Sequence, residues 1–73
     1  MTNAKIVNCK KAGVRANPMN PHADEDIIGT IQAGDVIKID STHKYYDWKD
    51  NGFYACDTPI GEGFINVELV EEL

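Results

Sequence analysis

Two short runs of β-branched residues, 27–31 and 36–39, stand on either side of a turn signal, Ala33-Gly34. Isoleucine, valine and threonine fit the pleated, half-buried surface of a strand. Gly34 can adopt the positive φ that a tight connection often needs. The pattern predicts a β-hairpin in a small all-β domain.

Turn signals recur at short intervals along the rest of the chain, and no apolar period of 3.6 residues extends over a useful length. We therefore expect short strands over residues 4–9, 12–16, 26–32, 35–41, 44–48, 53–57 and 62–66. The segment 17–25 contains two prolines and no apolar period, which predicts a long loop. The tail 66–73 is expected to form a short turn and then a closing strand near Leu69-Val70.

The core of such a domain must come from the alternating apolar positions of its strands. We expect the following residues to be mostly buried: Val14, Ile28, Val36, Cys56, Phe64 and Ile65. On that basis Ile28→Ala should be strongly destabilising. The segment 49–52 is expected to be a hairpin turn in which Gly52 supplies a positive φ.

Length and charge limit the functions that the chain can have. The chain has 73 residues, which corresponds to one domain, 1–73. Twelve acidic residues against seven basic ones give a net charge of −5, and an acidic surface is repelled by a phosphate backbone. We therefore expect no nucleic-acid partner. No apolar run approaches the length of a membrane span, so no membrane partner is expected either.

The N-terminal residues 1–5 lack the apolar segment of a signal peptide. This predicts a cytoplasmic or virion-associated protein, unless the chain is a module of a longer secreted protein. Cys9 and Cys56 could form one disulfide, but each also fits a strand as a small apolar side chain. We expect the two cysteines to be free thiols.

No set of residues predicts catalysis. The only serine is Ser41, neither cysteine has an assignable histidine partner, and His22 and His43 read as solvated loop residues. There is no metal-ligand spacing and no phosphate-binding loop. We expect a protein that is not an enzyme and needs no cofactor.

Binding is better supported, because aromatic residues concentrate between positions 45 and 54. Aromatic side chains with a polar tip suit partly exposed binding surfaces, although in so small a barrel some must fill the core. Loops on rigid barrels are also where binding residues gather. The candidate ligand-binding residues are four aromatic residues of this segment and one residue of the loop 17–26. They are Tyr45, Tyr46, Trp48, Tyr54 and Asp24.

Four ordered segments resemble the bacterial SH3 (SH3b) family: Val14-Arg15-Ala16-Asn17-Pro18, the stretch 27–36, Gly52-Phe53-Tyr54-Ala55-Cys56, and Gly61-Glu62-Gly63-Phe64-Ile65. Phe53 stands where the family usually has tryptophan. The resemblance implies an SH3-like, partly open β-barrel of about five to seven short strands, with a long loop after the second.

Members of that family commonly accompany cell-wall hydrolases and bind peptidoglycan peptides. The resemblance thus implies a non-catalytic binding module that recognises a peptide, such as the peptide part of bacterial cell wall. The alternative is a small structural or accessory protein, for example of a phage particle, that uses the barrel for protein–protein contacts.

Overall fold

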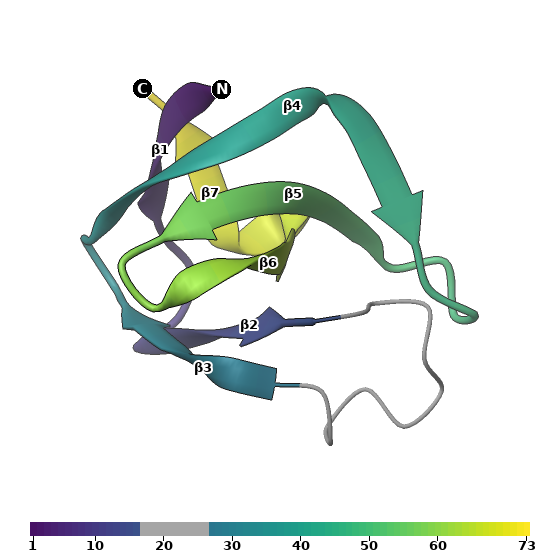
Figure 1. Ribbon diagram of the computed structural model, residues 1–73, viewed down its shortest axis with the longest axis horizontal. Helices are drawn as coiled ribbons and strands as arrows, with labels where there is room; N and C mark the ends of the chain where they lie inside the picture. Colours follow the sequence, from purple (N-terminus) through teal and green to yellow (C-terminus); the bar gives the residue numbers. More distant parts are fainter. Residues whose placement is uncertain (17–26) are drawn as a thin grey trace.

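The computed structural model describes residues 1–16 and 27–73, which form one seven-stranded antiparallel sheet (Figure 1). The strands follow the order β3-β2-β6-β5-β4-β1-β7 across the sheet. Their bounds are β1 Thr2–Ile6, β2 Lys11–Arg15, β3 Ile27–Gln32, β4 Val36–Tyr46, β5 Gly52–Thr58, β6 Gly61–Asn66 and β7 Val70–Glu72. The sheet curves without closing, so the prediction of a small, partly open SH3-like barrel is confirmed.

The predicted hairpin between residues 27–31 and 36–39 is wrong, because β3 pairs with β2 whereas β4 pairs with β1 and β5. A tight turn does join the two strands: the N–H of Asp35 donates to Gln32 O at 3.1 Å, and Gly34 has a φ of 88°. Backbone bonds from Ala33 to Lys10 and from Gly34 to Ile6 hold this turn between neighbouring elements. The turn therefore sends the chain to another part of the sheet instead of folding it back.

The predicted strands 35–41 and 44–48 are parts of one strand, β4, which is bent near its middle (Figure 1). Asp40 lies opposite Ala55, and Tyr45 lies opposite Phe53. The four residues 41–44 of β4 therefore correspond to a single residue of β5, Tyr54. The extra residues form a bulge, in which the backbone N–H of Thr42 donates to Asp40 Oδ1 at 3.1 Å. The bulge sets which side of the sheet each later residue of β4 faces.

The turn between β4 and β5 was predicted correctly in place but not in conformation. Asp50, with a φ of 62°, supplies the left-handed residue instead of Gly52. Aspartate tolerates this conformation better than most residues do. The carboxylate of Asp47 accepts hydrogen bonds from the backbone N–H groups of Lys49 and Asn51 at 2.9 and 2.8 Å. This turn is thus held by the side chain at its start.

The C-terminal prediction of a short turn followed by a closing strand is confirmed. Residues Val67–Leu69 form a 3-10 turn, η2, and β7 then pairs with β1. The side chain of Asn66 caps this turn by accepting a hydrogen bond from Glu68 N at 2.9 Å. The backbone N–H of Val7 donates to Leu69 O at 2.9 Å, which ties the turn to the N-terminal segment.

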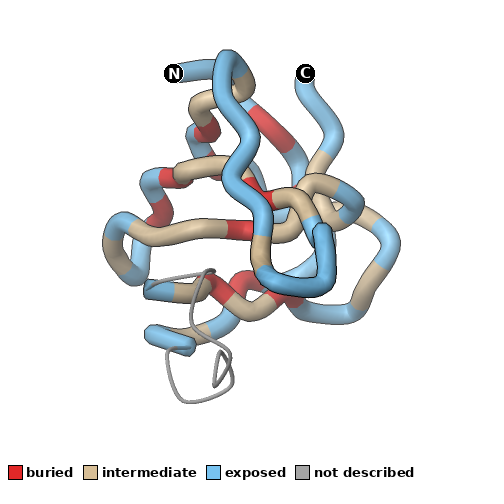
Figure 2. Tube along the Cα trace, turned by 90° about the vertical axis from the view of Figure 1, so that its right-hand side faces the viewer, coloured by how far each residue is buried: buried red, intermediate tan, exposed pale blue. Residues whose placement is uncertain are grey.

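Buried positions alternate with more exposed ones along the strands, as Figure 2 shows. Buried apolar residues are Ala4, Ile6, Ala12, Val14, Ile31, Ile37, Ile39, Phe53, Cys56 and Ile65. The expected burial of Val14, Cys56 and Ile65 is confirmed.

Two core predictions are wrong, and Phe64 is only half-buried. Val36 is 53% exposed because the inward phase of β4 runs through Ile37 and Ile39. Ile28 is 43% exposed, since the pairing of β2 with β3 skips this residue. Because Ile28 is exposed, Ile28→Ala is not expected to be strongly destabilising.

The strands β2 and β6, which are distant in sequence, approach each other closely at Gly63. Arg15 lies opposite Phe64, the one register pair between these strands. A Cβ on Gly63 would lie 2.7 Å from the carbonyl oxygen of Arg15 and 2.8 Å from Val14 Cγ1. Glycine is required here because the backbone of β2 occupies the space that a side chain would need.

Truncation of Ile39 should be far more destabilising than truncation of its exposed neighbour on the same strand. Ile39 is fully buried, so Ile39→Ala should lower the free energy of unfolding by about 2–5 kcal/mol. Val36→Ala, like Ile28→Ala, should cost less than about 1 kcal/mol because the removed methyl groups are half in solvent. Urea unfolding of the three variants is the measurement, and equal midpoints for Ile39→Ala and Val36→Ala would contradict the phase of β4.

The two cysteines are free, and they should differ in reactivity. Burial raises the pKa of the Cys56 thiol to about 11, so its nucleophilic thiolate is scarce at neutral pH. Cys9 is only half-buried. Ellman's reagent should therefore titrate one thiol rapidly in the native protein and both in urea. Equally fast reaction of both thiols before unfolding would show that Cys56 is accessible.

Candidate functional site

The predicted binding aromatics lie on two different sides of the sheet. Tyr45 lies opposite Phe53 and Tyr46 lies opposite Gly52, so the successive tyrosines of β4 face opposite ways. Tyr54 is half-buried and packs against the core. Trp48 lies beyond the end of β4, is 66% exposed, and has the Lys49 Nζ 4.9 Å from its ring centroid.

Asp24 and the loop 17–26 lie outside the described residues. The four described aromatics do not form one groove. Tyr46 and Tyr45 belong to two separate surfaces, Trp48 lies on the turn between β4 and β5, and Tyr54 packs against the core.

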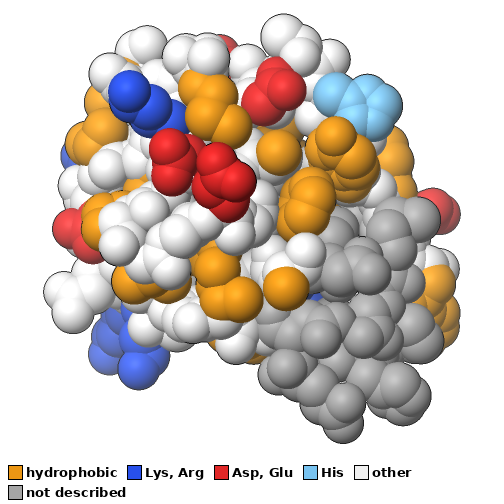
Figure 3. All heavy atoms as spheres, in the orientation of Figure 1, with side chains coloured by type: hydrophobic (Ala, Val, Ile, Leu, Met, Phe, Trp, Pro, Cys, Tyr) orange, Lys and Arg blue, Asp and Glu red, His pale blue; other side chains and the backbone are white. Residues whose placement is uncertain are grey.

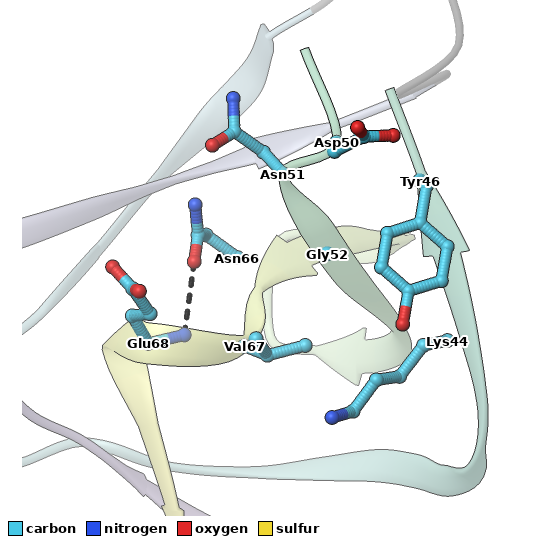
Figure 4. A pocket seen from close by; sticks show the side chains of 8 residues that line it. All are labelled: Lys44, Tyr46, Asp50, Asn51, Gly52, Asn66, Val67 and Glu68. Carbon is cyan, nitrogen blue, oxygen red and sulfur yellow. Dashed lines mark hydrogen bonds between the residues drawn. The ribbon is translucent and has the colours of Figure 1, made fainter. Parts of the chain in front are cut away.

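The first surface is a hollow of about 210 Å³ at the end of the barrel where β4, β5 and η2 meet, which we call the Tyr46 hollow (Figure 4). Figure 4 shows that side chains from β4, from the turn that leads into β5, and from the end of β6 and η2 surround it. Its lining residues are Lys44, Tyr46, Asp50, Asn51, Gly52, Asn66, Val67 and Glu68.

The floor of the Tyr46 hollow is a slot between an aromatic ring and an aliphatic side chain. A Cβ on Gly52 would lie 3.6 Å from Tyr46 Cε1 and 3.5 Å from Val67 Cγ2. The absence of a side chain at this position therefore leaves the apolar faces of Tyr46 and Val67 open to a ligand.

Two amide side chains at the rim are held in fixed orientations. Asn51 Nδ2 donates to Asp47 Oδ2 at 3.0 Å, and Asn66 Oδ1 accepts from the N–H of Glu68 at 2.9 Å. Asn51 Oδ1 and Asn66 Nδ2 form no hydrogen bond with another described side chain or backbone group. The rim thus offers one oriented acceptor and one oriented donor, together with the charged groups of Lys44, Asp50 and Glu68.

The second surface is on the outside of the sheet. The rings of His43 and Tyr45 meet edge to face at a centroid distance of 4.6 Å, and those of Tyr45 and Phe64 do so at 5.1 Å. Phe53, only 2% exposed, lies on the same side, with the Arg15 guanidinium carbon 5.4 Å from its ring centroid. Arg15 therefore has a structural role in covering this aromatic side chain.

Sequence reasoning did not identify most of the residues that complete these surfaces. It assigned His43 to a solvated loop and Phe64 to the core, and it did not consider the rim residues Asn51, Asn66 and Glu68. The alternation of His43 with Tyr45 was the one available signal for the outer surface. The hollow had no such signal, because it forms where η2 meets β4 and β5, and η2 is distant from β4 in the sequence.

The described residues contain no group of three or more His, Cys, Asp or Glu side chains positioned to hold a metal ion. No helix within 1–16 and 27–73 is long and apolar enough to cross a membrane. Comparisons with protein-family models, with curated proteins and with solved structures find no match.

The turn beside the Tyr46 hollow should weaken in acid. Hydrogen bonds from the Asn51 side chain, and then from the backbone N–H groups of Asn51 and Lys49, hold the pKa of Asp47 below its usual value. A carboxyl group with a lowered folded-state pKa stabilises the fold above its unfolded-state pKa of about 4. That contribution is lost as the pH falls through the folded-state value.

Wild type should therefore have a higher Tm than Asp47→Asn at about pH 7, and the difference should shrink towards about pH 2. Asparagine has nearly the same size as aspartate but cannot ionise. The substitution therefore changes the charge of the side chain and leaves its packing nearly the same. A Tm difference that stays constant over this range would show that the charge of Asp47 does not support the turn.

Proposed function

We propose that the protein is a non-catalytic, SH3b-like binding module that recognises a peptide, such as the peptide part of bacterial cell wall, in the Tyr46 hollow. The observation that supports this function is the combination of an open apolar slot over Gly52 with an oriented acceptor and donor at its rim.

A peptide fits this chemistry because each of its units presents the same combination. A peptide group needs one acceptor for its N–H and one donor for its C=O. Asn51 Oδ1 and Asn66 Nδ2 are groups of these two kinds. A small side chain can occupy the slot between Tyr46 and Val67, while Lys44 and the two carboxylates at the rim suit charged peptide termini.

The rigidity of the surrounding elements also supports recognition. Asn51 is held in the turn by Asp47, and Asn66 is held by its capping bond to Glu68. Groups that are already oriented lose little conformational entropy when a ligand binds. The hollow is open and shallow, so we expect micromolar to millimolar affinity for a short fragment.

Titration of the protein with peptidoglycan stem-peptide fragments, followed by amide chemical shifts, tests this function. Saturable shifts are expected at Tyr46, Asn51, Gly52 and Val67. Gly52→Ala should weaken binding about tenfold, since its methyl group occupies the slot at ordinary van der Waals distances from both walls. Trp48→Ala, which removes a more exposed aromatic nearby, is the matched control and should bind as wild type does.

Two results would contradict the proposal. One is the absence of shifts across a set of fragments. The other is a set of shifts that Gly52→Ala leaves unchanged, because the ligand would then occupy another surface. The spectrum of each variant without ligand shows whether it has kept the fold.

The exposure of isoleucines around β3 favours the second candidate, a structural or accessory protein of a larger particle. Ile27, Ile28 and Ile60 are 41%, 43% and 43% exposed. Apolar side chains of this size on a small surface are typical of protein contacts. Silence towards all wall fragments, together with co-purification into a large particle, would support this function over peptide recognition.

A further inference from the structure

The outer side of β4, β5 and β6 combines acidic and aromatic side chains on a surface that peptide binding in the Tyr46 hollow does not use. Cross-strand register places Asp57 directly opposite Glu62, and it places Asp40, Ala55 and Phe64 in the adjacent row. We call this surface the acidic–aromatic face, and its residues are Asp40, Tyr45, Ala55, Asp57, Glu62 and Phe64.

Figure 3 shows acidic side chains close together on this side of the molecule, with hydrophobic side chains between them and the histidine. Asp57 and Glu62 are exposed, Tyr45 is 37% exposed, and Ala55 and Phe64 are half-buried. The face is therefore accessible along most of its length.

The acidic charges on this face are only partly balanced by the described residues around it, since the N-terminal ammonium acts mainly on Asp40. Like charges directly opposite each other on neighbouring strands are destabilising, so the pairing of Asp57 with Glu62 has a cost. Lys38 lies opposite Asp57 on the other side and supplies one positive charge against two carboxylates in that row. Arg15 lies opposite Phe64, at the aromatic end, where it covers Phe53.

A shallow hollow lies between the acidic and the aromatic parts. It measures about 290 Å³, and Met1, Ala16, Ala55, Glu62 and Phe64 are among its lining residues. The small side chain of Ala55 leaves room above β5, and Phe64 provides an apolar wall. At the other end of this row, Asp40 stays ionised because hydrogen bonds from Thr42 lower its pKa.

We propose that the acidic–aromatic face docks an extended segment of a partner protein that carries a lysine or arginine. The aliphatic stem of this side chain lies over Ala55 and Phe64, and its charge lies beside Asp57 and Glu62. Lysine and arginine bury their stems on apolar surfaces while their charged ends stay hydrated, which matches a face that is apolar in the middle and acidic at its edge. Complementary charge also accelerates encounter and selects the partner.

This docking does not depend on the Tyr46 hollow, because Tyr45 and Tyr46 direct the two surfaces to opposite sides of β4. A second copy of the chain is a poorer occupant than a cationic partner, since each copy has a net charge of −5.

A pair of capped peptides tests the proposal: the sequence Gly-Leu-Lys-Leu-Gly, and the same peptide with its lysine acetylated. The lysine peptide should shift the amide signals of Ala55, Glu62 and Phe64 in a saturable way. Acetylation should weaken binding about fivefold, the effect expected of one exposed charge interaction. Added salt should weaken the lysine peptide only.

Substitution of the two opposed carboxylates, Asp57→Asn with Glu62→Gln, should weaken the lysine peptide about fivefold to tenfold. The matched control is Glu71→Gln with Glu72→Gln, which removes the same charge from the exposed residues of β7 and should leave binding unchanged. Gly52→Ala should also leave it unchanged, which separates this docking from peptide recognition in the Tyr46 hollow.

Equal binding of the two peptides would overturn the proposal, as would shifts confined to the Tyr46 hollow or no shifts at all. Shifts of Ala55 and Phe64 that grow with protein concentration without any peptide would also overturn it. In that case the face is an interface between copies of this chain. If the two double substitutions weakened binding of the lysine peptide equally, the effect would come from the net charge of the protein. That result would also contradict a specific site.

Discussion

The turn from Gln32 to Asp35 determines how the rest of the barrel is arranged. Three backbone hydrogen bonds join it to neighbouring segments: Ala33 N–H donates to Lys10 O, Gly34 N–H donates to Ile6 O, and Ile6 N–H donates to Asp35 O. These bonds place the end of β3 and the start of β4 against the segment that joins β1 to β2. As a result β4 leaves its sequence neighbour and pairs with β1. Only this departure brings β4 and β5 together as the central pair that carries both candidate surfaces.

The bulge in β4 then converts one aromatic cluster into two surfaces. Four residues, 41–44, lie opposite the single residue Tyr54 before the pairing resumes at Tyr45. Tyr45 thereby joins Phe53 and Phe64 on the outside, and Tyr46 reaches the hollow beside Gly52 and Val67. A segment one residue shorter would move each tyrosine to the other side of the sheet. The length of the insert thus separates a polar, oriented hollow from an acidic and aromatic face.

Local chemistry made most of the strands, the place of the turn at 49–52 and the C-terminal turn predictable, since each depends on residues that are close in sequence. The pairing of strands was not predictable in the same way. The segment 27–39 has the pattern of a hairpin, but its turn forms hydrogen bonds with the distant residues Ile6 and Lys10, and its two strands pair with other strands. Val36 and Ile28 were wrongly expected to be buried for related reasons. Each has an apolar neighbour in the sequence, so the pattern does not show which of the two faces inward. In addition, the register of β2 with β3 skips Ile28. The sequence indicated the aromatic cluster, but not its division between two surfaces, because that division depends on the bulge in β4.

The size of the domain explains why both candidate surfaces are shallow. The buried apolar set is dominated by alanine, valine and isoleucine, with Phe53 as its one large aromatic. A barrel of 73 residues encloses little volume, so Tyr45, Tyr46 and Trp48 stay 37%, 49% and 66% exposed. Exposed aromatic area on a rigid sheet supports recognition of extended chains better than enclosure of a small molecule. Each surface alone should bind weakly, and simultaneous use of the two sides of β4 would raise the overall affinity through effective concentration.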